Sequence, residues 1–254
     1  MQNLEGKVAI VTGGGSGIGR ATSLLFAQQG ARVVVADISL ENAQATVAQI
    51  AEFCGEAIAV KVDVRSDADC QRMVEQTLER FGQLDIAFNN AGIGGYPHLT
   101  ADYGVENWQR VIDINLTGVF NCMVHELKAM EAGGKGGAIV NTASIMGLKG
   151  TISGSAYCAS KHGVIGLTKA SALEAGRHGI RINAVCPGYI ETPMTTTGDD
   201  LVADKLIQAE LRRAAIRRMA KPQEVAELVA WLSSDKASFV SGSAYTVDGG
   251  VTAG

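Results

Sequence analysis

The sequence predicts an α/β fold: a single domain with a doubly wound parallel sheet of about seven strands and helices on both faces. Short β-branched apolar runs alternate with longer segments whose apolar residues recur at spacings of three and four. Nearly continuous apolar runs are typical of parallel strands that are buried on both faces. The 254 residues include four prolines and no low-complexity tract, so no linker is indicated and we expect one domain over residues 1–254.

The order of the elements supports this fold class, because a strand followed by a helix and another strand repeats along the chain. The predicted strands are Lys7–Val11, Arg32–Ala36, Ala57–Val62, Leu84–Phe88, Ala138–Thr142, Ile180–Val185 and Ser243–Val247. The predicted helices are Ile18–Gln29, Leu40–Phe53, Asp67–Phe81, Trp108–Met130, Ala156–Ala175 and Leu201–Ile216.

Composition excludes several classes of function. Twenty-two basic and 26 acidic residues give a net charge of −4, which offers no electrostatic basis for binding nucleic acid. No run approaches the roughly 18 apolar residues that span a bilayer, and the N-terminus does not resemble a signal peptide, so we expect a cytoplasmic protein without a membrane partner. Five widely spaced cysteines without a C-x-x-C pair predict free thiols and no metal site.

A glycine-rich turn follows the first predicted strand. In Val11-Thr-Gly-Gly-Gly-Ser-Gly-Ile-Gly-Arg20 the spacing of the glycines does not fit G-x-G-x-x-G. The strand ends at Thr12 and the helix begins near Ile18, so the amides and dipole of the helix favour an anion there. Gly13 removes a side chain at the turn, and Gly17 and Gly19 allow a phosphate and the neighbouring strand to approach the backbone.

Asp37 ends the second predicted strand, 18 residues beyond Gly19, close to the ~20 at which an acid meets the adenosine ribose of a dinucleotide. A carboxylate accepts hydrogen bonds from the ribose hydroxyls and repels a 2′-phosphate. A role as cap of the following helix stays open, with Ser39 as a competing cap. No arginine follows Asp37 directly, so NAD(H) is favoured over NADP(H); Arg20 and Arg32 are nearby cations that would weaken this preference.

Seven segments, in this order, resemble motifs of the short-chain dehydrogenase/reductase family. They are Thr12-Gly-Gly-Gly-Ser-Gly-Ile-Gly19, Asp63-Val64, Asn89-Asn-Ala-Gly92, Asn115-Leu-Thr-Gly118, Tyr157-Cys-Ala-Ser-Lys161, Pro187-Gly188 and Val247-Asp-Gly-Gly250. Each is common by chance, but all seven in order span essentially the whole chain. The resemblance implies a Rossmann-type fold and a homotetramer, with Ala156–Ala175 and the C-terminal segment at subunit contacts.

The resemblance also implies the residues of the site. The expected catalytic residues are Asn115, Ser144, Tyr157 and Lys161. The expected cofactor-binding residues are Gly13, Ser16, Gly17, Ile18, Gly19, Asp37, Asp63, Val64, Asn89, Ala91, Gly92, Tyr157, Lys161, Pro187, Gly188, Ile190 and Thr192. The expected substrate-binding residues are Gly95, Ser144, Met146, Tyr157 and Tyr189.

The residue types support this chemistry. Tyr157 and Lys161 are four apart, so they project from one helix face. A free tyrosine has a pKa of about 10, and a nearby ammonium is expected to lower it, which makes Tyr157 the candidate acid and base. Ser144, beyond the strand Ala138–Thr142, is a candidate donor to the substrate oxygen. The resemblance implies that Asn115 supports a water-linked proton path to Lys161 and that Lys161 binds the nicotinamide ribose.

These expectations predict an enzyme that transfers hydride between NAD(H) and a small-molecule secondary alcohol/ketone pair. One alternative is a 3-oxoacyl-[acyl-carrier-protein] reductase, whose usual NADPH dependence fits Asp37 poorly. A basic cluster would meet an acidic carrier protein but is more typical of a solvated helix face; its members are Arg212, Arg213, Arg217 and Arg218. A second alternative is a non-catalytic NAD(H)-sensing protein, against which the intact catalytic set argues.

The chain is expected to divide its tasks between two halves. The cofactor-binding half covers about residues 1–150, and the catalytic and substrate-binding elements cover about residues 140–254. Within the second half, about residues 189–215 are expected to form a substrate lid, because this segment begins where a strand ends and ligands bind. The polar run Thr195–Asp200 predicts a hinge. An ordinary surface helix behind a loop is the alternative for this segment.

Overall fold

The computed structural model describes residues 4–196 and 201–253 and contains one seven-stranded sheet. Its strands are β1 (Val8–Thr12), β2 (Arg32–Asp37), β3 (Ala57–Lys61), β4 (Ile86–Asn89), β5 (Gly137–Thr142), β6 (Ile180–Pro187) and β7 (Ala244–Val247). All neighbouring strands are parallel, in the order β3-β2-β1-β4-β5-β6-β7. The predicted fold class is confirmed.

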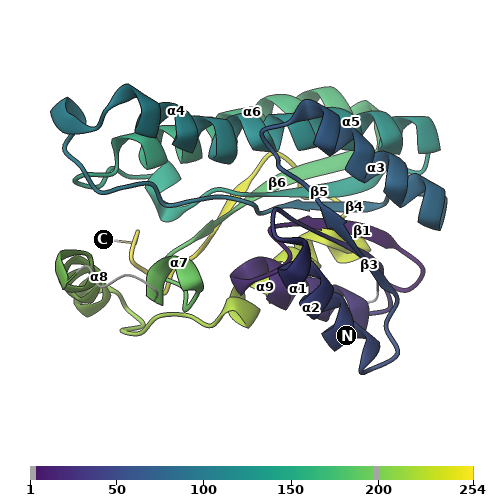
Figure 1. Cartoon of the computed structure of the whole chain (residues 1–254), viewed down its shortest axis with the longest axis horizontal. Coiled ribbons are helices and arrows are strands. Elements are labelled where there is room, and N and C mark those ends of the chain that lie inside the picture. Colours follow the sequence, from purple (N-terminus) through teal and green to yellow (C-terminus); the bar gives the residue numbers. More distant parts are fainter. Residues whose placement is uncertain (1–3, 197–200, 254) are drawn as a thin grey trace.

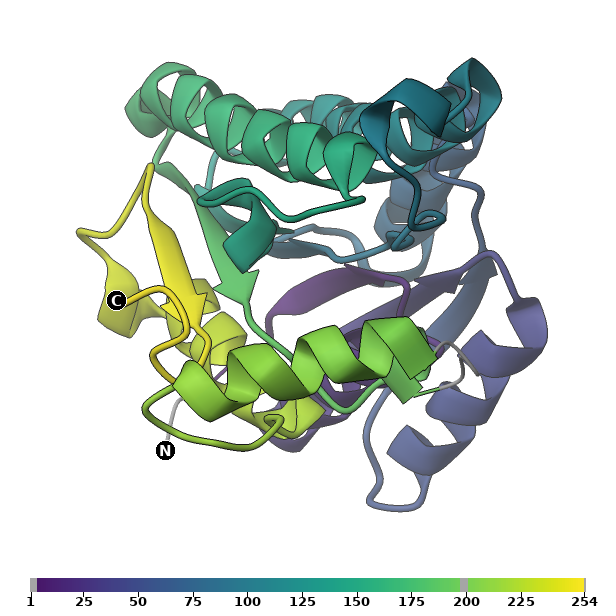
Figure 2. The same cartoon turned by 90° about the vertical axis from the view of Figure 1, so that its left-hand side faces the viewer.

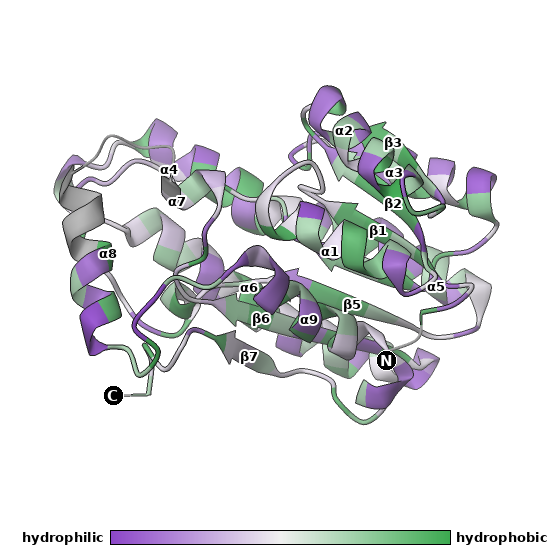
Figure 3. Cartoon of the chain, turned by 90° about the horizontal axis from the view of Figure 1, so that it is seen from below, coloured by the Kyte–Doolittle hydropathy of each residue, from purple (hydrophilic) through white to green (hydrophobic). Residues whose placement is uncertain are grey.

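Helices cover both faces of this sheet, as Figure 1 shows. On one face lie α3 (Asp67–Phe81), α4 (Val105–Ile112), α5 (Gly118–Gly133) and α6 (Ser155–Ala175). On the other lie α1 (Gly17–Gln28), α2 (Leu40–Ala51) and α9 (Pro222–Ser233). Each face has its own buried core, and the strands are coloured hydrophobic over much of their length in Figure 3 because both of their faces are covered.

The order of the strands reverses at β1, which has β2 on one side and β4 on the other. The loops that follow β1 and β4 therefore lead to opposite faces of the sheet. In open parallel sheets, ligands bind at the carboxyl ends of the strands at such a point. Two further helices, α7 (Pro193–Thr196) and α8 (Leu201–Arg213), lie at one end of the molecule beside the sheet (Figures 1 and 2).

The structure differs from the expected elements in two places. The helix expected over Trp108–Met130 is instead α4 and α5, joined by a π-helical turn over Asp113–Thr117. A π turn carries one extra residue per turn and is frequent at functional sites. The helix α9 was not predicted; Pro222 occupies its first turn and the carboxylate of Glu224 accepts a hydrogen bond from Lys221 N, as at a capping box.

Candidate active site

The glycine-rich turn connects β1 to α1 at the point where the strand order reverses. Its close packing requires glycine: a Cβ on Gly19 would lie 2.1 Å from the carbonyl oxygen of Gly13, which itself has a φ of +64°. The hydroxyl oxygen of Thr12 accepts hydrogen bonds from Asn90 N (2.9 Å) and Ala91 N (3.2 Å). The turn is therefore fixed against the loop that follows β4.

The first turn of α1 fits an anionic group. Its N-cap residue, Ser16, is exposed and its side chain makes no capping hydrogen bond. No acidic residue lies in the first turn of α1. Free amides at a helix N-terminus bind phosphate, so Ser16, Gly17 and Ile18 could hold the pyrophosphate of a dinucleotide.

Asp37 reaches this turn from the end of β2. One carboxylate oxygen accepts a hydrogen bond from Gly15 N and the other from Ser39 N, both at 2.9 Å. Ser39, and not Asp37, is the N-cap of α2, because its hydroxyl accepts from Asn42 N. The capping role considered for Asp37 is therefore taken by Ser39, and the Asp37 carboxylate lies beside the glycine-rich turn.

The two arginines near the turn contact groups other than the Asp37 carboxylate. The guanidinium of Arg20 donates to the carbonyl oxygen of Gly15 and, through Nε at 3.2 Å, to Thr46. Arg32 is the first residue of β2, at the opposite end of that strand from Asp37, and its guanidinium lies 5.4 Å from the centre of the Phe81 ring. Neither arginine forms an ion pair with Asp37 in the described part of the chain.

The segment Asp63-Val64, after β3, is held against α5. Arg65 pairs with Asp63 through Nε at 2.9 Å and holds the pKa of that carboxyl below its usual value. The carbonyl oxygen of Val64 accepts from Asn121 Nδ2 at 3.0 Å, and a Cβ on Gly118 would lie 2.6 Å from a methyl of Val64. These contacts fix the segment Asp63-Val64 against α5.

Asn89 differs from its expected role in cofactor binding. Its side chain is buried and donates to Glu126 Oε2 (2.9 Å) and to Asn141 Oδ1 (3.1 Å). It therefore points into the core beneath the site. Ala91 and Gly92, which follow in the same loop, lie near the surface at partly buried positions.

Tyr157 and Lys161 lie together on α6, as their spacing predicts. The Nζ atom of Lys161 lies 5.6 Å from the centre of the Tyr157 ring and donates to the carbonyl oxygen of Thr142 at 2.7 Å. Ser144 follows β5, and its hydroxyl interacts with Tyr157. The same hydroxyl accepts from Met146 N at 3.1 Å, which places Met146 beside the candidate catalytic group.

Burial controls the pKa values of this pair. Lys161 is only 3% exposed, and burial lowers the pKa of its ammonium to about 8. Burial also raises the pKa of Tyr157 above its ordinary value, while the hydrogen bond with Ser144 opposes that rise. The lowering of the Tyr157 pKa expected from Lys161 is not found in the structure described: burial raises this pKa, and the opposing effect comes from Ser144.

Asn115 lies in the π-helical turn between α4 and α5 and is fully buried. Its amide exchanges two hydrogen bonds with the backbone of Ile93, both at 2.8 Å, and donates to Ser160 Oγ at 3.3 Å. A Cβ on Gly92 would lie 3.1 Å from Asn115 Oδ1 and 3.6 Å from Lys161 Nζ. Asn115, Gly92 and Lys161 therefore meet at one place.

The segment after β6 lies against the glycine-rich turn between β1 and α1. Gly188 N donates to the carbonyl oxygen of Val247, and Ile190 is buried. A Cβ on Gly17 would lie 3.1 Å from a methyl of Thr192, so Thr192 lies against the glycine-rich turn. Met194, in α7, lies opposite Gly94 in the loop after β4. This loop continues into Gly95, whose φ is +78° and whose Cβ would lie 2.6 Å from the Tyr103 hydroxyl.

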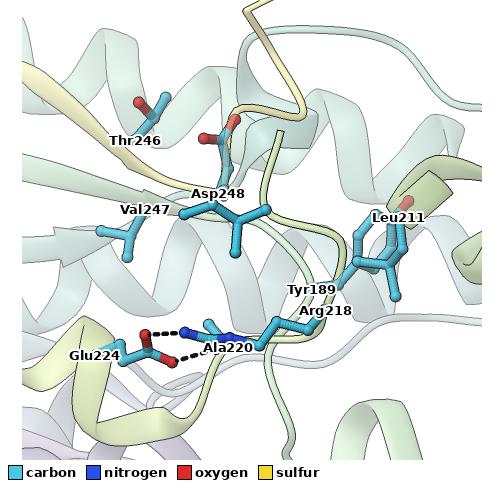
Figure 4. A pocket seen from close by; sticks show the side chains of 10 residues that line it. Tyr189, Leu211, Arg218, Ala220, Glu224, Thr246, Val247 and Asp248 are labelled. Atoms are coloured by element: carbon cyan, nitrogen blue, oxygen red, sulfur yellow. Dashed lines mark hydrogen bonds and ion pairs between the residues drawn. The ribbon is translucent and has the colours of Figure 1, made fainter. Parts of the chain in front are cut away.

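Tyr189 lines a separate cavity of about 250 Å³ (Figure 4). Its wall includes Leu211 and Asp248 but not Ser144, Tyr157 or Lys161. Asp248 accepts from Gly250 N and Thr252 N, and Arg218 pairs with Glu224 at 2.7 Å. Tyr189 also packs, with Met146, against the cluster of Ile145, Ala214 and Val251, and Ile145 directly follows Ser144.

The basic cluster expected at the end of α8 is exposed and partly neutralised. Arg218 is bound by Glu224, and Arg213 lies 4.0 Å from Glu210. Arg212 and Arg217 are exposed.

In the ranges that the structure describes, no helix is long and apolar enough to cross a membrane.

Comparisons with known proteins agree with this arrangement. A family model described as enoyl-(acyl carrier protein) reductase matches residues 13–252. The cyclohexanol dehydrogenase of Acinetobacter sp. is 51% identical over 97% of this chain and 95% of its own length. The 2,5-dichloro-2,5-cyclohexadiene-1,4-diol dehydrogenase of Sphingobium indicum is 44% identical over the whole of both chains.

Solved structures share the fold as well as the sequence. The crystal structure of a short-chain type dehydrogenase/reductase from Mycobacterium marinum is 36% identical, with a TM-score of 0.93 over 99% of this chain and 98% of that one. These relatives match the chain from end to end, including the glycine-rich turn and the helix of Tyr157 and Lys161. The chain therefore belongs to the short-chain dehydrogenase/reductase family and is an oxidoreductase.

Proposed function

We propose that this enzyme transfers hydride between NAD(H) and a cyclic secondary alcohol/ketone pair of the cyclohexanol class. The observation that carries the proposal is the convergence of Ser144, Tyr157, Lys161 and Asn115 beside an anion-binding helix N-terminus. The names of two similar relatives support the ring substrate, since both act on hydroxyl groups of six-membered carbon rings.

The residues around the turn fit a nicotinamide dinucleotide without a 2′-phosphate. The pyrophosphate would lie on the amides of Ser16 to Gly19, and the adenosine ribose would bind Asp37. A 2′-phosphate needs a cation, but Arg20 is bound to Gly15 and Thr46, and Arg32 lies over Phe81. This supports NAD(H) over NADP(H).

The cofactor supplies the hydride acceptor or donor, and the chain's residues handle the proton and the geometry. Tyr157 holds the proton at its phenolic oxygen and removes it from the alcohol or returns it to the ketone. Ser144 donates a hydrogen bond to the substrate oxygen where negative charge develops. Lys161 supports the phenolate and holds the nicotinamide ribose, and Asn115, fixed by Ile93, would hold a water on the path to Lys161.

We further propose that α8 forms part of a lid over the site. Its C-terminal end is anchored, because Lys149 pairs with Glu210 at 2.6 Å and Ala214 packs with Ile145 and Val251. Movement would therefore be confined to the beginning of the lid, near α7. Residues 197–200 of the expected hinge lie outside the described residues.

The remaining expectations also stay proposals. They are the division at about residue 150, cytoplasmic localisation, and a homotetramer that uses α6 and the C-terminal segment. Leu173 on α6 is 87% exposed and Phe239, before β7, is fully exposed, so each presents apolar surface that a partner subunit would cover. Size-exclusion chromatography with light scattering tests the assembly.

The function is tested by following reduced nicotinamide spectroscopically. NAD⁺ should give faster turnover with cyclohexanol than with linear secondary alcohols, and Tyr157→Phe should lower this turnover strongly. NADPH with an acetoacetyl thioester tests the carrier-protein alternative. Of the four arginines that would meet an acidic carrier protein, Arg212 and Arg217 are exposed and have no described acidic partner. Efficient reduction of the thioester with no ring alcohol turned over would refute the proposal.

A further inference from the structure

A line of polar side chains crosses the core directly beneath the site. Glu126 on α5, Asn89 at the end of β4, Asn141 on β5 and Thr168 on α6 are all buried, none more than 1% exposed. Asn89 Nδ2 donates to Glu126 Oε2 at 2.9 Å and to Asn141 Oδ1 at 3.1 Å. Asn141 Nδ2 donates to Thr168 Oγ1 at 3.0 Å and to the sulfur of Met123 at 3.3 Å.

This network lacks one hydrogen. Both amide hydrogens of Asn89 and both of Asn141 are used by the four bonds above. Two buried oxygens, Glu126 Oε1 and Asn89 Oδ1, have no partner. A buried acceptor without a donor is costly. A proton on Glu126 Oε1 would remove both defects, because the acid would then donate to the amide that already binds its other oxygen.

The surroundings of Glu126 favour the same protonation state. Within the described residues, the one hydrogen-bond partner of this carboxyl group is Asn89, and no cation pairs with it. The thiol of Cys122, on the same helix, interacts electrostatically with Glu126, and its sulfur lies 3.6 Å from that of Cys70 on α3. β4, β5 and α6 face it with the amides and hydroxyl already named. His125, the preceding residue, pairs with Asp67 instead. Burial raises the pKa of Glu126 to about 7.

The network is continuous with the candidate active site at two points. Asn89 is followed by Asn90, whose amide binds Thr12 in the glycine-rich turn. Asn141 is followed by Thr142, whose carbonyl oxygen holds the ammonium of Lys161 at 2.7 Å. A carboxylate formed at Glu126 would disturb the two strand ends that position the cofactor loop and Lys161.

We propose that Glu126 is a positioning residue that carries a proton in the active enzyme and joins β4, β5 and α6 beneath the cofactor loop and Lys161. The role in positioning rests on the proposed function, but the protonation of Glu126 does not. When the proton leaves Glu126, Asn89 Oδ1 loses its hydrogen-bond donor. The ends of β4 and β5 then hold the cofactor loop and Lys161 less firmly, although no group that touches substrate has changed.

The protonation is tested by difference infrared spectroscopy on the purified full-length chain at pH 6 and pH 9. The wild type should show the carbonyl band of a buried carboxylic acid, and Glu126→Gln should lack it. Glu131→Gln is the matched control, because Glu131 lies on the same helix but is exposed. A wild-type spectrum with no Glu126-dependent acid band at pH 6 would overturn the proposal without any reference to activity.

The positioning role is tested by pH profiles of the same variants. Glu126→Gln replaces the acid by an amide that supplies the missing hydrogen at every pH. The wild type is expected to show a rise in KM for NAD⁺ between pH 6 and pH 9. Glu126→Gln should keep kcat within about twofold at pH 6 and should not show that rise. Profiles of wild type and Glu126→Gln that run parallel, in folded protein, would refute the positioning role. No turnover in any variant would refute the proposed function, while the infrared result would stand.

Discussion

Replacement of Lys161 by methionine is expected to stabilise the protein while it abolishes activity. Burial lowers the pKa of Lys161 to about 8, whereas an unfolded chain gives about 10.5. A lysine whose folded pKa is depressed opposes folding: the cost is complete below the folded pKa and disappears as the pH rises toward the unfolded value. From these two values the cost is about 3 kcal/mol at pH 7 and about 1.4 kcal/mol at pH 9.5.

Lys161→Met removes this cost and also the hydrogen bond to Thr142, whose loss lowers the stability of the variant at both pH values. The decisive quantity is therefore the difference between variant and wild type in the free energy of unfolding. This difference should shrink by about 2 kcal/mol between pH 7 and pH 9.5. Urea unfolding without cofactor at both pH values measures it. Lys169→Met, on the exposed face of the same helix, is the control. If the difference for Lys161→Met does not change with pH, the buried-ammonium account is wrong.

Three further predictions address the reaction and the cofactor. Tyr157→Phe should lower kcat by about 10² to 10⁴ with NADH affinity unchanged, because only the ionisable oxygen is lost; stopped-flow turnover and fluorescence titration separate the two, and near-normal turnover would exclude Tyr157 as the acid. The wild type should prefer NAD⁺ over NADP⁺ by at least about tenfold in kcat/KM, or about 1.4 kcal/mol. Asp37→Ser should reduce this preference for NAD⁺. A wild type that favours NADP⁺ would contradict the assignment of NAD(H) as cofactor. Gly19→Ala should lose NADH binding at least about tenfold, since its Cβ would lie 2.1 Å from a carbonyl oxygen; calorimetry checks this, and unchanged affinity would show that the turn can adapt.

Much of the fold could be predicted because it depends on local pattern. Apolar runs and helical spacing located the seven strands within two residues at each end. The π-helical turn at Asn115 could not be predicted, since its apolar spacing resembles that of a continuous helix and its cause is a side-chain pairing with Ile93, 22 residues away.

The candidate site divides in the same way. Tyr157 and Lys161 meet because one helix carries both, and helix geometry makes that predictable. Asn89 points into the core because it binds Glu126 and Asn141 there. These partners lie 37 and 52 residues further along the chain, so local sequence could not predict the orientation of Asn89. The pKa of Tyr157 depended on burial, which a neighbouring charge in the sequence does not reveal.

The pairing of Asn115 with Ile93 limits how the enzyme's specificity can be altered. The side-chain amide offers one donor and one acceptor to Ile93, as a neighbouring peptide group in a strand would do. These two hydrogen bonds fix the loop after β4 as far as Ile93. Asn115 makes no such bonds with Gly94 or with the exposed residues that follow it. Substitutions at residues 96–98, beyond the tightly packed Gly95, should therefore leave the pairing of Asn115 with Ile93 in place. A change at Asn115 alters the loop and the proton path together, so a loss of activity in that variant reports a displaced loop as much as a missing catalytic group.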